Sequence, residues 1–293
     1  MASGHVTMTR LPRSEYYIGA LLVIVSAVTF STAGLFTKGV EADSWGVIFW
    51  RGLFAAILTT LWIWNRRTLR HSFLGMGYSG LAVAVVGALG TAAFIASFKL
   101  TSIANVSLIY AISPLIAALL GWIVIGERIS SRVMVGCFGA LLGAAIIVSG
   151  SLGSIGLYGD LLALCMATVM AFIMVTYRRY PDTPGAGPAV LSSALLLPVA
   201  MMLGDPFAVD RAEILVLAAF GLLFAIASVT LAEGAKRVPS GQTALLSALE
   251  TPLAPVLAFL VFTEFPNTPT LVGGSVVLLA VLYSIRNTTE SKA

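Results

Sequence analysis

Ten apolar runs, separated by short polar gaps, constrain this chain more than any other feature of its sequence. Each run is long enough, or nearly so, to cross a hydrocarbon core about 30 Å thick as a helix. Because lipid offers the backbone no hydrogen-bond partners, such segments span a membrane only as helices or closed barrels. The runs are Tyr17–Thr37, Trp45–Trp64, Gly77–Phe98, Ile103–Ile125, Val133–Gly150, Gly156–Tyr177, Ala189–Leu203, Ile214–Ala235, Gln242–Phe262 and Pro269–Ile285. The sequence therefore predicts an all-α integral membrane protein with ten transmembrane helices.

The composition excludes a water-soluble domain and a nucleic-acid-binding protein. Of 293 residues, 58% are hydrophobic and 10% charged, which is more apolar surface than a soluble chain of this length can hide. The net charge of +4 comes from basic residues in the gaps between apolar runs, not from a basic face or tail. Cys137 and Cys165 lie in apolar runs and are expected to be small core residues, so no metal or cofactor is predicted.

The Lys and Arg residues predict the orientation in the membrane. If the N-terminus is cytoplasmic, 13 of the 17 face inside, three face outside and Arg51 lies within a run. The inside residues are Arg10, Arg13, Arg66, Arg67, Arg70, Arg128, Arg132, Arg178, Arg179, Lys236, Arg237, Arg286 and Lys292, and the outside residues are Lys38, Lys99 and Arg211. The positive-inside rule then puts both tails, residues 1–16 and 288–293, in the cytoplasm, and the protein is expected in the inner (plasma) membrane.

The segment Lys99–Leu142 recurs in a fainter copy 137 residues later, at Lys236–Leu279. A self-match at so long a period indicates two homologous halves, residues 17–150 and 151–287, rather than a solenoid. Five helices per half is an odd number, so the second half enters the membrane upside down. The prediction is two inverted five-helix repeats around a central cavity that opens to alternate sides.

The two copies also share a motif. Pro114 precedes Glu127 by 13 residues and Pro252 precedes Glu264 by 12. With Arg51 early in the second run and basic residues before the fourth and ninth, this pattern resembles the drug/metabolite transporter superfamily, in its ten-helix branch of paired EamA-type domains. The resemblance covers nearly the whole chain. It implies export or exchange of small organic metabolites, often amino acids, and the aromatic amino acid exporters of this branch look similar.

Polar and aromatic residues on the third, fourth and ninth runs are predicted to line the substrate cavity. They are Tyr78, Phe94, Asn105, Ser107, Tyr110, Gln242, Thr243, Ser247 and Glu250. Aromatic walls with a few hydroxyls suit an amphipathic solute, although Ser and Thr also serve helix packing in membranes. Met166, Met170 and Met174, spaced four apart, either pack or line an adaptable site.

Charged residues and prolines inside the runs complete the candidate machinery. Glu250 lies about 13 Å into the ninth run, where a carboxylate must face a cavity or a partner. It either carries a proton or contacts a substrate ammonium, or it only ties helices together. The prolines Pro114, Pro252 and Pro255 either kink helices that line the site or merely shape packing. Gating or bracing is expected of Arg51, Lys99, Glu127 and Glu264.

Three classes of membrane protein compete. An intramembrane enzyme would need a motif such as HExxH or GxSxG, and neither is present. A channel is disfavoured because nothing resembles a ring of filter residues. The remaining class is a secondary carrier, expected to work as a monomer in the lipid bilayer on a small-molecule substrate without nucleic acid. The resemblance implies that its substrate is an aromatic or broadly hydrophobic amino acid; the alternatives are drugs, nucleosides or other metabolites.

Overall fold

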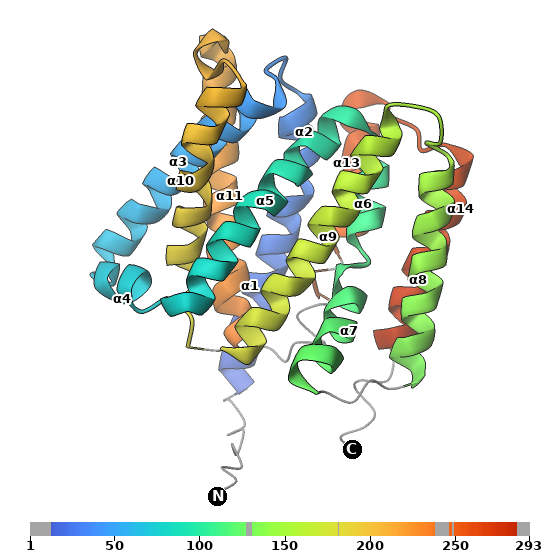
Figure 1. Cartoon of the computed structure of the whole chain (residues 1–293), viewed down its shortest axis with the longest axis horizontal. Coiled ribbons are helices and arrows are strands. Elements are labelled where there is room, and N and C mark those ends of the chain that lie inside the picture. The colour runs from blue at the N-terminus through green and yellow to red at the C-terminus, as the bar shows by residue number, and fades with distance from the viewer. Residues whose placement is uncertain (1–12, 127–130, 181, 238–245, 248, 286–293) are drawn as a thin grey trace, which may run out of the picture.

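A computed structural model describes residues 13–126, 131–180, 182–237, 246–247 and 249–285. These residues form one bundle of helices (Figure 1) and contain no strand. The helices are α1 (Arg13–Ser31), α2 (Ala33–Lys38), α3 (Ser44–Asn65), α4 (Leu69–Leu74), α5 (Gly77–Leu100), α6 (Ile103–Tyr110), α7 (Ser113–Ile125), α8 (Ser131–Ser149), α9 (Gly156–Arg179), α10 (Ala186–Leu203), the 3₁₀ turn η1 (Pro206–Ala208), α11 (Arg211–Arg237), α13 (Glu250–Phe262) and α14 (Thr268–Ile285).

The predicted apolar runs all correspond to helices in the described part of the chain. Seven helical segments are long and apolar enough to cross a membrane: Ser14–Lys38, Ser44–Asn65, Gly77–Leu100, Ile103–Ile125, Gly156–Tyr177, Ala186–Leu203 and Arg211–Gly234. Three shorter apolar helices follow the remaining runs: Met134–Ser149, Leu253–Phe262 and Thr268–Ala280. The all-α membrane architecture is thus confirmed. The short helix α4, between the second and third spans, was not predicted.

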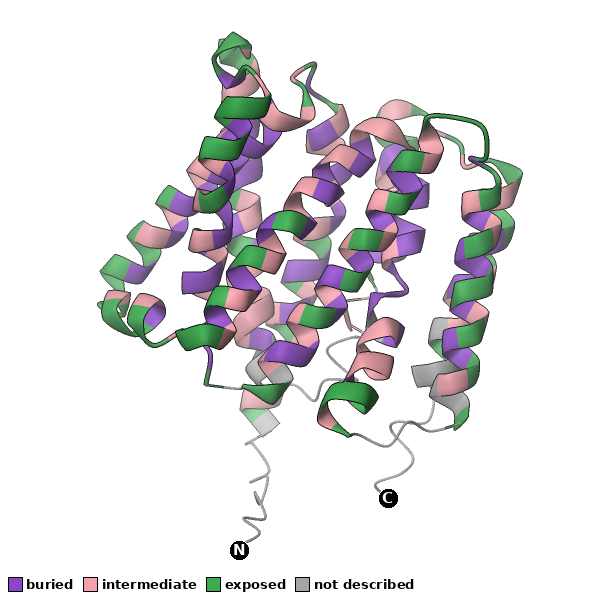
Figure 2. Cartoon of the chain, viewed as in Figure 1, coloured by how far each residue is buried: buried purple, intermediate pink, exposed green. Residues whose placement is uncertain are grey.

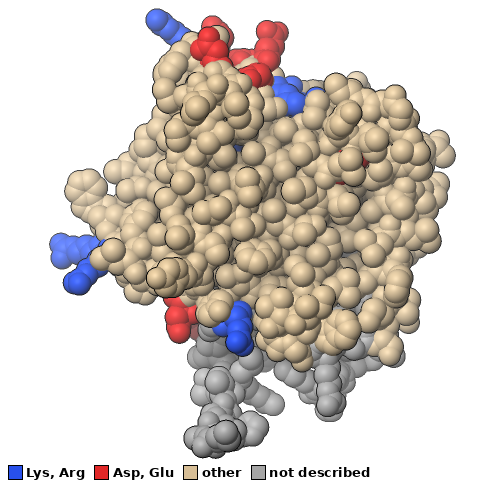
Figure 3. All heavy atoms as spheres, in the orientation of Figure 1, with Lys and Arg blue, Asp and Glu red and all other residues tan. Residues whose placement is uncertain are grey.

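The surface of the bundle is that of a protein surrounded by lipid. Large apolar side chains such as Leu89, Phe138 and Leu260 are exposed, and Figure 2 shows exposed residues along the outward faces of the helices. On the face shown in Figure 3, Lys, Arg, Asp and Glu gather at the two ends of the bundle, with a largely uncharged band between them. Apolar side chains outside and charges at the ends match a hydrocarbon core bounded by water.

The described chain begins and ends at the same end of the bundle, where α1 starts and α14 finishes (Figure 1). We call this the terminal end and the opposite one the distal end. The sixth span, α9, runs from the distal to the terminal end, antiparallel to α1. An odd number of spans per half produces this inversion.

Helix pairings repeat when the spans of one half are exchanged for those of the other. The first span, α1, packs along α11, just as the sixth, α9, packs along α5. Likewise α7 packs on α9, as α13 packs on α1. The fifth and tenth spans, α8 and α14, pack on each other, as do the second and seventh, α3 and α10. These pairings are those of two inverted five-helix units related by a pseudo-two-fold axis.

Glycines allow α8 and α14 to approach closely. A Cβ atom on Gly143 would lie 2.6 Å from the backbone oxygen of Gly273, and a Cβ atom on Gly273 would lie 2.5 Å from that of Gly143. Only glycine fits at both positions, because any side chain would collide with the backbone of the opposite helix. Small residues at such contacts are what let membrane helices pack without a hydrophobic driving force.

Two predicted spans are interrupted near the middle of the bundle. The fourth is broken at Ala111 and Ile112, which separate α6 from α7, and Pro114 falls in the first turn of α7. A proline is tolerated there because the first turn of a helix has free N–H groups in any case. In the ninth span, α13 begins at Glu250 and includes Pro255. Pro114 and Pro252 therefore fall in the first turns of α7 and α13, whereas Pro255 lies inside α13.

Candidate functional site

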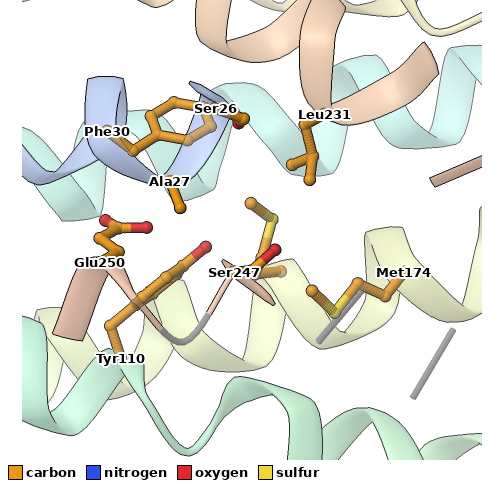
Figure 4. A pocket seen from close by; sticks show the side chains of 9 residues that line it. Ser26, Ala27, Phe30, Tyr110, Met174, Leu231, Ser247 and Glu250 are labelled. Atoms are coloured by element: carbon orange, nitrogen blue, oxygen red, sulfur yellow. The ribbon is translucent and has the colours of Figure 1, made fainter. Parts of the chain in front are cut away.

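A small pocket lies between the two halves, near the start of α13. Its walls come from α1, α6, α9, α11 and the residues just before α13 (Figure 4). The lining residues are Ser26, Ala27, Phe30, Tyr110, Met170, Met174, Leu231, Ser247 and Glu250. Its volume is about 10 Å³, close to the minimum that holds one water molecule. A metabolite can occupy this site only after the surrounding helices move apart.

Glu250 places a carboxylate in this pocket. Its side chain is largely buried, with 8% of the residue exposed. Among the described residues, no side chain forms an ion pair or hydrogen bond with it. Glu250 is the first residue of α13, so the positive end of the helix dipole favours its negative charge. A buried carboxyl group with no partner in the described part of the chain is available to interact with a solute.

Two hydroxyl groups accompany Glu250. The Oγ atom of Ser247 is buried and has no hydrogen-bond partner in the described structure. Figure 4 shows the Tyr110 ring beside Glu250, with its hydroxyl directed into the pocket. Phe94 does not line the pocket but supports it, because its ring lies 5.8 Å from that of Tyr110. The predicted residues Tyr110, Ser247 and Glu250 thus come together around one space.

Apolar side chains from other helices form the rest of the wall. Met170 and Met174 on α9 line the pocket, which is the alternative role considered for the methionine series. Ser26 on α1 donates a hydrogen bond of 2.8 Å to the backbone oxygen of Ala227 on α11. Sequence reasoning missed Ser26 and Phe30, because their role depends on how α1 packs in three dimensions and no local signal distinguishes them.

Several predicted lining residues lie elsewhere. Tyr78 stands at the terminal end of α5 and is 93% exposed, as expected of an aromatic ring at a membrane interface. Ser107 donates to the backbone oxygen of Ile103, one turn earlier in α6, so its hydroxyl serves its own helix. Neither residue lines the pocket, and the predicted positions are corrected accordingly. Gln242 and Thr243 lie outside the described residues.

Asn105 belongs to a polar cluster near the distal end, not to the pocket. Its side-chain nitrogen donates to Asp160 at 3.0 and 3.2 Å, and its side-chain oxygen accepts from Thr270. Thr101 adds a 2.8 Å bond to Asp160. The cluster joins α6 of the first half to α9 and α14 of the second. Asp160 had a sequence signal, since it is an acid within an apolar run, but it was not singled out.

Charged side chains connect the halves at the distal end. Lys38 at the end of α2 forms an ion pair of 3.1 Å with Glu264, which follows α13. The other oxygen of Glu264 accepts a 2.9 Å bond from the backbone N–H of Ile103, at the start of α6. Lys99 donates to the backbone oxygen of Val40 at 2.7 Å. We call these contacts the distal seal.

At the terminal end the described contacts are fewer. Arg237 bonds to Glu233 at 2.8 Å and to Glu15 at 3.1 Å. The hydrogen bond with Glu233 raises the pKa of the Arg237 guanidinium. Glu127, the predicted counterpart of Glu264, lies outside the described residues.

Arg51 is buried on α3, with 2% of the residue exposed. Its guanidinium carbon lies 4.1 Å from the ring centroid of Phe224 and 5.4 Å from that of Phe220, both on α11. The Nε atom has no hydrogen-bond partner in the described structure, and Arg51 forms no ion pair there. The Arg51 guanidinium thus makes cation–π contacts with aromatic rings in place of an ion pair with an acidic side chain. This packing of α3 against α11 is the bracing alternative for Arg51.

Comparison with known proteins gives a consistent result. The model of the EamA-like transporter family matches the chain twice, over residues 17–149 and 157–286. "Uncharacterized transporter YyaM" of Bacillus subtilis (strain 168) is 24% identical over 274 residues, covering 88% of this chain and 89% of that protein. "Probable biotin transporter" of Pseudomonas aeruginosa is 26% identical over 281 residues, covering 89% and 94%. A crystal structure with 19% identity superimposes with a TM-score of 0.64, covering 94% of this chain and 98% of that one, which shows a shared fold.

Proposed function

Because the chain belongs to the EamA-like transporter family, we propose that it is a secondary transporter exporting small amphipathic metabolites by alternating access. The proposed substrates are amino acids with aromatic or otherwise hydrophobic side chains. In this proposal the terminal end faces the cytoplasm and the protein works as a monomer in the inner membrane. The basic loops near that end support the orientation.

One observation carries the proposal: Glu250, which has no ionic partner among the described residues, lies in a pocket between the halves at the start of α13. Transporters built from inverted repeats bind substrate near the bilayer midplane, at helices interrupted in this way. The hydroxyls of Ser247 and Tyr110 supply polar contacts, while Phe30, Leu231 and the two methionines suit an apolar side chain.

The distal seal supports alternating access. It joins α2 and α6 of the first half to Glu264 of the second, so it must break for the pocket to open toward that side. The inverted pairing of helices gives the protein two arrangements of similar energy, related by exchange of the halves. Substrate is proposed to select between them.

Flux measurements in proteoliposomes test the proposal. Vesicles containing the purified full-length protein and loaded with labelled phenylalanine should release label at a saturable rate, faster when unlabelled phenylalanine is outside. Exchange of this kind separates a carrier from a channel, and unchanged chemical identity of the label separates it from an enzyme. Glu250→Gln vesicles are the control. Release at the rate of protein-free vesicles for every hydrophobic amino acid tested would refute the proposed substrate class.

A second candidate substrate class is suggested by the Pseudomonas relative, which is named a probable biotin transporter. Biotin is a carboxylate anion, whereas the described lining contributes a carboxylate of its own. Labelled biotin in the same vesicles distinguishes the two classes, because biotin exchange without amino acid exchange would favour this alternative.

A further inference from the structure

We infer that the pocket selects cationic amines: solutes with an ammonium group on an apolar body bind better than the corresponding amino acids, and carboxylate anions are rejected. The inference rests on the proposed transport of small amphipathic metabolites and, within that class, prefers amines to amino acids. The structural basis is the buried side chain of Glu250, which has no ion pair among the described residues and lies in a pocket whose described walls contain no Lys, Arg or His.

The first step concerns the charges in and around the pocket. Among its described lining residues, Glu250 is the only Asp or Glu, and none is Lys, Arg or His. The sequence between Arg237 and Leu246 contains no Lys, Arg or His, so this neighbouring stretch cannot supply a cation either. A substrate carboxylate would therefore lose its hydration beside another carboxylate, which is strongly unfavourable.

The second step concerns Arg51, the buried cation that could be thought to bind such a carboxylate. Arg51 does not line the pocket. Its guanidinium lies against the ring of Phe224, and Phe224 in turn contacts Phe30 on the pocket wall, with ring centroids 5.9 Å apart. The side chains of Phe224 and Phe30 therefore separate the guanidinium from the pocket. Its charge already makes cation–π contacts with the aromatic rings of α11.

The third step concerns what the pocket offers to a cation. An ammonium group can form charge-assisted hydrogen bonds with Glu250, and it can also donate to the unpartnered Oγ atom of Ser247. The ring of Phe30 presents a face that attracts cations, and the thioethers of Met170 and Met174 adapt to varied apolar bodies. Each of these contacts is made without any substrate carboxylate.

Equilibrium binding tests the inference without interference from passive leakage of amines. Isothermal titration calorimetry on the purified full-length protein in detergent compares three ligands with one phenyl body: phenethylamine, phenylalanine and 3-phenylpropionate. Biotin is the fourth. We expect phenethylamine to bind about tenfold or more tightly than phenylalanine, and the two carboxylates to show no binding.

Two variants assign the effect to the pocket. Glu250→Gln should weaken phenethylamine binding about tenfold or more, as loss of a charge-assisted hydrogen bond requires. Glu250→Asp should keep the order of preference. Asp205→Asn is the matched control, because Asp205 is exposed at the distal end and its side chain caps no helix; its affinities should equal those of the wild type.

The outcomes separate the inference from the proposed function. Phenylalanine binding as tightly as phenethylamine, together with phenylalanine exchange in vesicles, would overturn the cation preference and leave amino acid transport standing. Binding of 3-phenylpropionate or biotin would also overturn the preference. Absence of binding for all four ligands, with no exchange in vesicles, would refute both. If Glu250→Gln does not fold, the order of the ligand affinities measured for the wild type still tests the inference.

Discussion

The side chain of Glu264 bridges Lys38 and the backbone of Ile103, with its two oxygens 3.1 Å from the lysine nitrogen and 2.9 Å from the amide nitrogen. Glu264, which follows the end of α13, therefore contacts both the end of α2 and the beginning of α6. Both charged side chains are partly exposed, at 26% for Lys38 and 19% for Glu264. The contact is therefore moderate in strength, which suits the opening and closing that the proposed alternating access requires.

Glu264→Gln should loosen the distal seal. The substitution keeps an acceptor for Ile103 but removes the ion pair, worth about 1 kcal/mol or less at a partly exposed site. We expect amide hydrogen exchange over residues 101–108 to become faster by up to about fivefold, while exchange in α11 near Arg237 is unchanged. Mass spectrometry of the purified protein measures both regions, with Asp205→Asn as the control. Equal exchange rates in wild type and variant would show that the ion pair does not hold the seal.

Glu250→Gln should separate activity from stability. The carboxylate is buried without an ionic partner in the described structure, so neutralising it removes a desolvation penalty. We expect the melting temperature to stay the same or rise, while exchange of labelled substrate falls about tenfold or more. A lower melting temperature would instead assign Glu250 a structural role. Wild-type flux at every pH tested would rule it out as an essential proton carrier or substrate ligand.

Asn105→Leu should destabilise the protein without changing its substrate affinity. The amide of Asn105 joins Asp160 to Thr270, and its loss leaves a buried carboxylate with fewer donors, at a cost of about 1–3 kcal/mol per unsatisfied group. The melting temperature should fall, and the KM for transport should remain that of the wild type because Asn105 does not line the pocket. A raised KM with unchanged stability would return Asn105 to the substrate site.

Gly143→Ala should disrupt the contact between α8 and α14. Its new Cβ atom would lie 2.6 Å from the backbone oxygen of Gly273, and overpacking of this kind costs about 1–3 kcal/mol. The matched control is Gly52→Ala on α3, where the nearest atom to a new Cβ is 3.6 Å away. Thermal unfolding in detergent should show a lower melting temperature for the first variant only. Equal melting temperatures would mean that the two helices separate without loss.

The membrane architecture was predictable because it depends on the length and polarity of contiguous runs. Such runs are visible in the sequence of any helical membrane protein. Glu250 was predictable for the same reason, as a charge in an apolar run is conspicuous. Tyr78 and Ser107 lie outside the pocket for different reasons. Tyr78 stands at the start of its span, where aromatic rings often mark the membrane interface, whereas Ser107 donates to the backbone of its own helix.

Other parts of the site depend on tertiary structure. Ser26 and Phe30 become pocket residues only because α1 packs along α11. Arg51 was expected to gate or to brace, and its contacts with Phe220 and Phe224 depend on how α3 packs on α11. Pairings between helices far apart in the chain decide these roles, and a hydropathy pattern contains no information about them.

The size of the pocket bears on the affinity of any ligand that enters it. The described residues around Glu250 leave room for about one water molecule, so a larger ligand must separate the helices that carry them. Part of its binding free energy is then consumed in that separation, and the measured affinity is lower than the contacts alone would give.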